Sequence, residues 1–129
     1  MAKRKSRILV VEDEDAIRRP IQETLAQHGY HVEAAAGGHE GLEAIQNSPP
    51  FDLAILDIKL PGLSGSQLLR YLEQESPQTE VIIISGYATP ELRTDAVSHG
   101  AFTVLQKPFG LNDLLHVVDR LMQPSGRAH

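Results

Sequence analysis

The stretch Phe51–Gly65, FDLAILDIKLPGLSG, decides the fold. Its four consecutive apolar residues, Leu53–Leu56, lie between Pro49-Pro50 and Pro61-Gly62. A short apolar run bounded by turn residues predicts a strand that is buried on both faces. Asp57 follows directly, and a carboxylate at the end of such a strand is costly to bury unless a partner or a ligand uses it. Asp57 is therefore the first candidate functional residue. A simple capping role is the alternative, and it is weakened because other apolar runs also end in polar residues.

Three further apolar runs predict strands at Ile8–Val11, Val81–Ile84 and Ala101–Gln106. A fifth segment, His31–Ala35, alternates in the way of a half-exposed edge strand. Helical spacing and capping signals mark five helices between and after these strands, at residues 17–28, 42–45, 64–72, 89–99 and 111–122. Strict alternation of strands and helices predicts an α/β, doubly wound fold with a five-stranded parallel sheet and helices on both faces.

Local signals refine three of these helices. Ser64 with Gln67 three residues later predicts a capping box, and Thr89 before Pro90 predicts a capped helix start. Pro20 lies inside the first helix, where we expect it to kink or loosen the first turns. The glycine pairs near the helix starts are interpreted as turns, because the chain contains no G-x-x-x-x-G-K-[ST] phosphate-binding motif.

Composition narrows the class of protein. The 129 residues suit one compact domain over 1–129, with a core at about 7–122 and short polar tails at Ala2–Arg7 and Gln123–His129. A net charge of -5 argues against direct binding of nucleic acid. The apolar runs are too short to span a membrane, and the absence of cysteine excludes disulfides and thiolate metal sites. We expect a cytoplasmic protein with no membrane partner.

Polar, chemically active residues follow four of the predicted strands: Glu12 with Asp13, then Asp57, Ser85 and Lys107. In open parallel sheets, ligands bind beyond the carboxyl ends of the strands, so these side chains should converge. Gathered carboxylates favour a hard cation such as Mg²⁺, whose ligands are carboxylates, waters and phosphate. A carboxylate can accept a phosphoryl group as an acyl phosphate, with metal and ammonium neutralising the transferred charge. The pattern predicts phosphoryl chemistry at this edge.

The chain resembles the receiver (CheY-like) domain of two-component response regulators over Arg7–Met122. Four segments carry the resemblance: ILVVEDE at 8–14, LAILDIKLPGLSG at 53–65, VIIISGYAT at 81–89 and GAFTVLQKPF at 100–109. The resemblance implies a flavodoxin-like (βα)5 sheet of order 2-1-3-4-5. It also implies a phosphoprotein of a phosphorelay, in which Asp57 takes a phosphoryl group from a sensor histidine kinase or a phosphotransfer protein.

The same resemblance implies roles for the other site residues. Asp13 and Asp57 would bind Mg²⁺ together with the backbone carbonyl of Lys59, and Glu12 would act mainly through water. The Lys107 ammonium would contact the phosphoryl group, with a cis bond between Lys107 and Pro108. The Ser85 hydroxyl would move when the phosphoryl group arrives.

Three residues depart from the usual pattern of the family. Glu12 replaces the commonest aspartate, and Lys59 adds a cation two residues after the acceptor, where we expect it to meet Glu12 and alter the lifetime of the phosphoryl group. Val104 occupies the place of an aromatic switch residue. Because valine has no ring and a stiff χ1 angle, we expect the loop Gly86–Thr89 to carry the conformational change instead.

The function implied is a phosphoacceptor that catalyses its own phosphorylation and dephosphorylation, so it is not an enzyme with a separate substrate. The sequence does not identify the output domain or the partner protein. One form of output is a dimer, formed through the helix after Thr89, the last strand and the last helix. The alternative is a receiver-like interaction module that is not phosphorylated. A magnesium-dependent phosphohydrolase is disfavoured, because Lys59 stands where such enzymes carry a second acid. The six histidines show no metal-ligand spacing.

Overall fold

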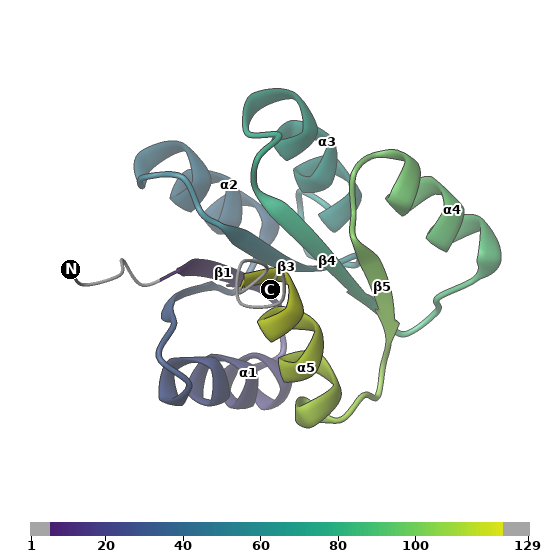
Figure 1. The fold of residues 1–129 in the computed structure, drawn as a ribbon. Coiled ribbons are helices and arrows are strands. Elements are labelled where there is room, and N and C mark those ends of the chain that lie inside the picture. Colours follow the sequence, from purple (N-terminus) through teal and green to yellow (C-terminus); the bar gives the residue numbers. More distant parts are fainter. Residues whose placement is uncertain (1–5, 123–129) are drawn as a thin grey trace, which may run out of the picture.

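Five parallel strands alternate with five helices in the computed structural model, which describes residues 6–122 (Figure 1). The strands are β1 (Arg7–Val11), β2 (His31–Ala35), β3 (Leu53–Asp57), β4 (Glu80–Ser85) and β5 (Thr103–Gln106). The helices are α1 (Asp15–Gln27), α2 (Gly38–Asn47), α3 (Gly65–Glu75), α4 (Pro90–Ser98) and α5 (Leu111–Met122). Of the polar tails expected at Ala2–Arg7 and Gln123–His129, residues 2–5 and 123–129 lie outside the described residues.

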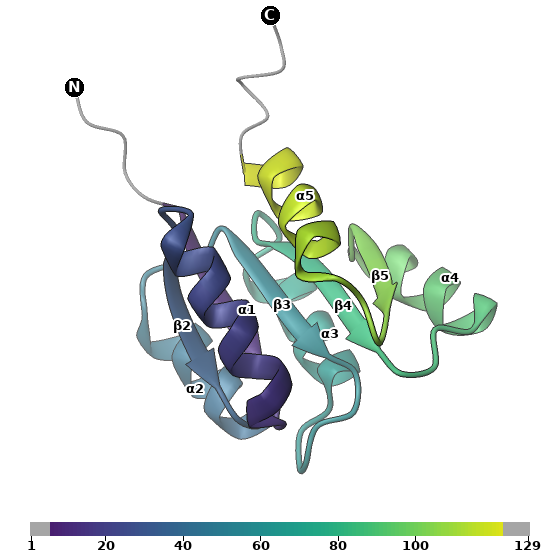
Figure 2. The same cartoon turned by 90° about the horizontal axis from the view of Figure 1, so that it is seen from below.

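The strand order is β2-β1-β3-β4-β5, and every neighbouring pair is parallel. Figure 2 shows β3 and β4 between the edge strands β2 and β5. This confirms the predicted flavodoxin-like α/β topology. The register pairs Val11 with Leu56 and Asp57 with Ile84, so the carboxyl ends of the three central strands lie level. Residues that follow these strands are therefore brought to one edge of the sheet.

Helices cover both faces of the sheet. Helices α1 and α5 lie on one face and α2, α3 and α4 on the other (Figure 1). Each face has its own apolar core: Ile21 and Val118 pack in the first, and Leu68 and Leu72 in the second. Full burial of such side chains contributes about 1.5–3 kcal/mol each, so the two cores together fix the sheet between the helical layers.

The central strand β3 is buried along its whole length, as the sequence predicts, with Asp57 only 4% exposed. Strand β2 is confirmed as an edge strand with a partly exposed surface. The predicted caps are also confirmed. Ser64 Oγ accepts from Gln67 N at 3.2 Å while Ser64 N donates to Gln67 Oε1 at 2.9 Å, and Thr89 Oγ1 accepts from Leu92 N at 3.1 Å.

Two local expectations were wrong. Strand β5 begins at Thr103, because Ala101 N donates to Ala96 O at 3.0 Å and still closes the end of α4. Arg7 belongs to β1 and not to a solvated tail. Its guanidinium lies 4.9 Å from the centre of the Phe51 ring and pairs with Glu33. Pro20 lies inside α1, which continues on both sides of it, and the kink expected there stays a prediction.

Within residues 6–122, each helix is too short or too polar to cross a membrane.

Candidate functional site

The polar residues predicted from the strand ends do converge. Glu12 and Asp13 follow β1, and Asp57 is the last residue of β3. One carboxylate oxygen from each of these three residues lies within 4.8 Å of the others. Glu12 is fully buried and Asp57 nearly so, whereas Asp13 is exposed. The result is an acidic pocket, Glu12, Asp13 and Asp57, that is closed on the protein side and open to solvent at Asp13.

Lys107 supplies the cation of the acidic pocket. Its Nζ lies 2.8 Å from Glu12 Oε1 and 3.3 Å from Asp57 Oδ2. The residue follows β5, and the peptide bond between Lys107 and Pro108 is cis. The ammonium is therefore shared between a carboxylate after β1 and the carboxylate that ends β3.

Burial and charge act on the protonation of this pair. Burial raises the pKa of Glu12 above the usual value for a glutamate, and the Asp57 charge adds to it, against the opposing effect of Lys107. Burial alone would lower the pKa of Lys107, but the Glu12 and Asp57 carboxylates outweigh it, so the pKa of Lys107 is raised. Lys107 thus carries its positive charge at neutral pH and holds the pocket together.

The acidic pocket fits a hard metal cation. Three carboxylates gather there and one ammonium pairs with two of them, Glu12 and Asp57, so negative charge is in excess. Glu12 Oε1 is buried and, among the described residues, has only this ion pair, without a well-directed hydrogen bond. Oxygen donors at this spacing are the ligands that Mg²⁺ uses. Within residues 6–122, the group with metal-ligand geometry consists of these three carboxylates.

Close packing fixes the position of Asp57. A Cβ atom added at Gly65 would lie 2.1 Å from the carbonyl oxygen of Asp57, so only glycine lets α3 begin against the end of β3. The next peptide is held as well, because Ile58 N donates to Ile84 O at 3.0 Å and Gly65 N donates to Ile58 O at 3.0 Å. On the side chain, Asp57 Oδ1 accepts from Lys59 N at 3.3 Å. The carboxylate therefore presents a fixed face toward the edge of the sheet.

Ser85 and Val104 lie on β4 and β5, and the register places Ser85 one residue beyond the partner of Asp57. Ser85 is the last residue of β4 and is 2% exposed, and its Oγ accepts from Tyr87 N at 3.0 Å. Val104 is buried at 3% exposure, so its side chain is part of the core. Phe102, which directly precedes β5, is 47% exposed and does not fill the place of a buried aromatic residue.

The expected pair between Lys59 and Glu12 is absent from the structure. Lys59 Nζ lies 5.1 Å from the centre of the Tyr87 ring, and Glu12 pairs with Lys107 instead. The buried Glu12 carboxylate faces the interior, where a lysine from the surface loop would lose its hydration. Lys59 thus joins the loop after β3 to the loop after β4.

Arg18 of α1 supports the acidic pocket and was missed by sequence reasoning. Its guanidinium donates to the carbonyl oxygens of Glu12 at 2.9 Å and Asp13 at 3.5 Å, and it pairs with Asp15. A cation within the first turns of α1, directly after the acidic run, was the available signal. Arg18 fixes the backbone from which two pocket carboxylates extend.

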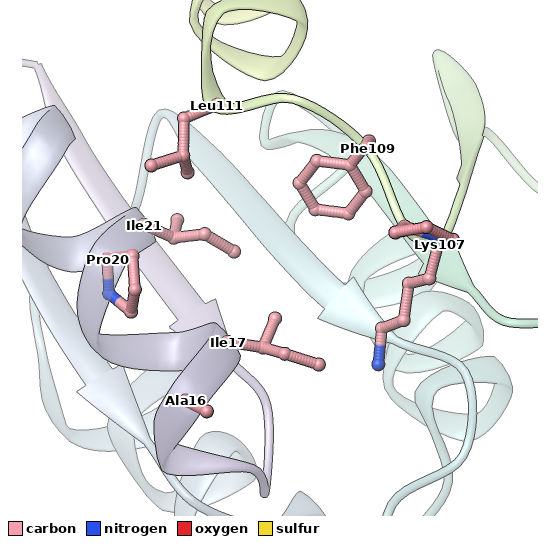
Figure 3. Close-up of a pocket in the computed structure, with 8 residues that line it drawn as sticks. Ala16, Ile17, Pro20, Ile21, Lys107, Phe109 and Leu111 are labelled. Atoms are coloured by element: carbon pink, nitrogen blue, oxygen red, sulfur yellow. The ribbon is translucent and has the colours of Figure 1, made fainter.

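An apolar groove of about 400 Å³ adjoins Lys107. Figure 3 shows Ile17 and Ile21 of α1 on one side and Phe109 and Leu111 on the other, with the Lys107 ammonium at one end. The groove therefore runs between α1 and the start of α5, and it opens beside the acidic pocket.

Comparison with known proteins identifies the class. The family model "Response regulator receiver domain" matches residues 8–119. The response regulator receiver protein CpdR of Brucella abortus is 33% identical over 116 residues, which cover 90% of this chain and 96% of CpdR. A CheY-like receiver domain from Methanospirillum hungatei has 35% identity and a TM-score of 0.86, covering 97% of this chain and all of that chain.

A third match is a solved complex whose name includes BeF3 and magnesium. The CheX–CheY–BeF3–Mg complex of Borrelia burgdorferi contains a chain with 25% identity and a TM-score of 0.85, with 91% of this chain and 89% of that chain covered. Three further curated relatives are 33%, 35% and 39% identical, and the chain spans only 25%, 53% and 47% of their respective lengths.

The chain belongs to the response regulator receiver domain family. It is a receiver domain of two-component signalling, a phosphoacceptor and not a conventional enzyme. Receiver domains bind Mg²⁺, and the acidic pocket is consistent with a phosphoaspartate site.

Proposed function

We propose that Asp57 accepts a phosphoryl group from the phosphohistidine of a sensor kinase or a phosphotransfer protein. The observation that carries this proposal is the buried Asp57 carboxylate with the Lys107 ammonium 3.3 Å away and two further carboxylates within 4.8 Å. Asp57 is the member of the acidic pocket that ends the central strand, where close packing holds it in place.

In the proposed step, one Asp57 oxygen attacks phosphorus while the bond from phosphorus to the donor imidazole nitrogen breaks. The electron pair of that bond returns to the imidazole, and an acyl phosphate remains on Asp57. Lys107 contributes its ammonium to the incoming phosphoryl oxygens, and Glu12 keeps the ammonium in reach.

We assign the metal site to Asp13, Asp57 and the backbone carbonyl of Lys59, with Glu12 acting through water. Mg²⁺ bound there supplies charge neutralisation for the transferring phosphoryl group. Arg18 holds the Glu12 and Asp13 backbone in place for this purpose. The phosphodonor protein packs in the apolar groove between α1 and the start of α5, because that groove ends at Lys107.

Output is assigned to Ser85 and the β4–α4 loop, Gly86–Thr89, because the buried Val104 has no ring to rotate. The face formed by α4, β5 and α5 supplies the surface for a second copy of the chain, since Val97 and Phe102 are 53% and 47% exposed there. Sedimentation with and without a phosphoryl mimic tests for this dimer.

The deciding experiment is mass spectrometry after incubation with a small phosphodonor and Mg²⁺. The wild type should gain one phosphoryl mass in an acid-stable, base-labile adduct that requires the metal. Asp57→Asn should abolish the adduct, and the exposed-site control Asp113→Asn should retain it. An adduct at wild-type yield in Asp57→Asn refutes the assignment, and no adduct in the wild type supports the interaction module that is not phosphorylated.

A further inference from the structure

The side-chain amide of Gln106 holds the β4–α4 loop from the end of β5. Gln106 Nε2 donates to the carbonyl oxygens of Gly86 at 2.6 Å and Lys107 at 2.9 Å, and Gln106 Oε1 accepts from Ala88 N at 2.9 Å. Both ends of the amide are therefore used, and two of its three bonds reach the loop. A side-chain amide that bonds the backbone of the residue before and of the residue after a given position restrains the backbone at that position.

The residue enclosed by these two loop bonds is Tyr87, whose backbone N–H donates to Ser85 Oγ at 3.0 Å. Gln106 thus stabilises the loop conformation in which the Ser85 hydroxyl is engaged by its own loop. Arg93 of α4 adds support, since its Nε donates to Ala88 O at 3.2 Å and its Nη1 donates to Val104 O at 2.8 Å.

We propose that Gln106 is a positioning residue that opposes the movement of Ser85 toward the phosphoryl group. This inference rests on the proposed role of Asp57 as acceptor. For Ser85 Oγ to turn toward Asp57, the Tyr87 N–H must lose its acceptor, and the loop that carries it must shift. Because Gln106 holds the residues on either side of Tyr87, its bonds favour the loop conformation seen here over the shifted one.

The expected effect is local, because Gln106 is exposed and belongs to neither apolar core. A phosphoryl mimic binds only those molecules in which Ser85 is free to meet it, so its apparent affinity is proportional to the fraction of such molecules. Removing the amide raises that fraction. Loss of hydrogen bonds of ordinary net strength predicts about fivefold tighter binding of the mimic.

The test compares fluoroberyllate affinity with Mg²⁺ affinity by NMR titration of wild type, Gln106→Leu and the control Gln46→Leu. Gln46 is an exposed glutamine on α2. Gln106→Leu should bind fluoroberyllate about fivefold more tightly, with the Mg²⁺ affinity unchanged, and the control should match wild type. Gln106→Ala repeats the measurement if the leucine variant does not fold. Equal or weaker fluoroberyllate binding in the folded variant overturns the proposal.

A double-mutant cycle separates this role from a purely structural one. In a Ser85→Ala background, Gln106→Leu should leave fluoroberyllate affinity unchanged, and a persisting gain overturns the role assigned to Ser85. Hydrogen exchange without ligand should be faster at the Tyr87 and Ala88 amides of Gln106→Leu. If exchange at these two amides is unchanged in Gln106→Leu and its fluoroberyllate affinity equals that of wild type, the role of Gln106 is overturned and the proposed function still stands. If wild type does not bind fluoroberyllate at all, the proposed function itself is overturned.

Discussion

The acidic pocket and the β4–α4 loop lie at the same edge of the sheet, but different interactions hold them. In the pocket, Glu12 is fully buried and Asp57 is 4% exposed, so packing and charge fix both carboxylates. In the loop, Tyr87 is 73% exposed, and polar side chains such as Gln106 hold the backbone. The residues proposed to accept the phosphoryl group are therefore held by the core. The proposed conformational change of the loop instead depends on a few hydrogen bonds at the surface.

The helices that flank these two regions differ in the same way. Helix α3, which begins against Asp57, buries Gly65, Leu68, Leu69 and Leu72. Helix α4, which follows the loop, buries Ala96 alone. Segments with few buried apolar contacts open at lower free energy than the core. We infer that α4 and its loop move more readily than the acceptor does.

The largest effect expected from this difference concerns stability. Leu72→Ala in α3 should lower the free energy of unfolding by about 2–5 kcal/mol, because it removes a buried side chain and leaves a cavity. Val97→Ala on the exposed side of α4 should change it by less than about 0.5 kcal/mol. Urea denaturation followed by circular dichroism measures both. Similar costs at the two sites would show that α4 is packed as firmly as α3.

Removal of a pocket carboxylate should act on metal binding and leave the fold intact. Asp13→Ala should weaken Mg²⁺ affinity about tenfold or more, because a direct oxygen ligand is lost. Its melting temperature without metal should stay close to that of wild type, since Asp13 is exposed. Glu23→Ala, at an exposed site on α1, is the matched control. Retention of full Mg²⁺ affinity in Asp13→Ala would place the metal elsewhere.

The smallest effect concerns the bridge between the two regions. Lys59→Ala removes the ammonium over the Tyr87 ring and should speed loss of the phosphoryl group about two- to fivefold, in line with about 0.5–1 kcal/mol for an exposed cation–π contact. Tyr87→Leu should match it, and Lys59→Arg should stay close to wild type. The test is to measure the rate of dephosphorylation of wild type and the three variants after the phosphodonor is removed. Equal rates in all four proteins would exclude a role for the contact between Lys59 and Tyr87.

The fold was predictable because its signals are local. Apolar runs such as Leu53–Leu56, caps such as Ser64 and the alternation of elements depend on near neighbours in the chain. The convergence of Glu12, Asp13, Asp57 and Lys107 was also predictable, because parallel topology places the strand ends at one edge.

The partners of long polar side chains were not predictable. Lys59 was expected to meet Glu12, yet it lies over Tyr87, because the buried Glu12 carboxylate is already paired with Lys107. Gln106 gave no sequence signal of its bonds, and the only signal for Arg18 was its place shortly after the acidic run, since these bonds depend on loop backbones that the sequence pattern does not define. Such contacts are set by tertiary geometry and not by spacing.

The exposed Tyr87 ring has a consequence for optical work. The chain has three tyrosines and no tryptophan, so tyrosine emission is not masked by energy transfer to an indole. Tyr30 is buried and donates to the Asp119 carboxylate at 2.5 Å, which favours quenching of its emission. Tyr71 of α3 is held away from α4 by its contact with α2, where its hydroxyl accepts from Gln46 Nε2 at 3.4 Å. Changes in emission as the loop moves should therefore come mainly from Tyr87, which makes it a label-free fluorescent reporter of the β4–α4 loop.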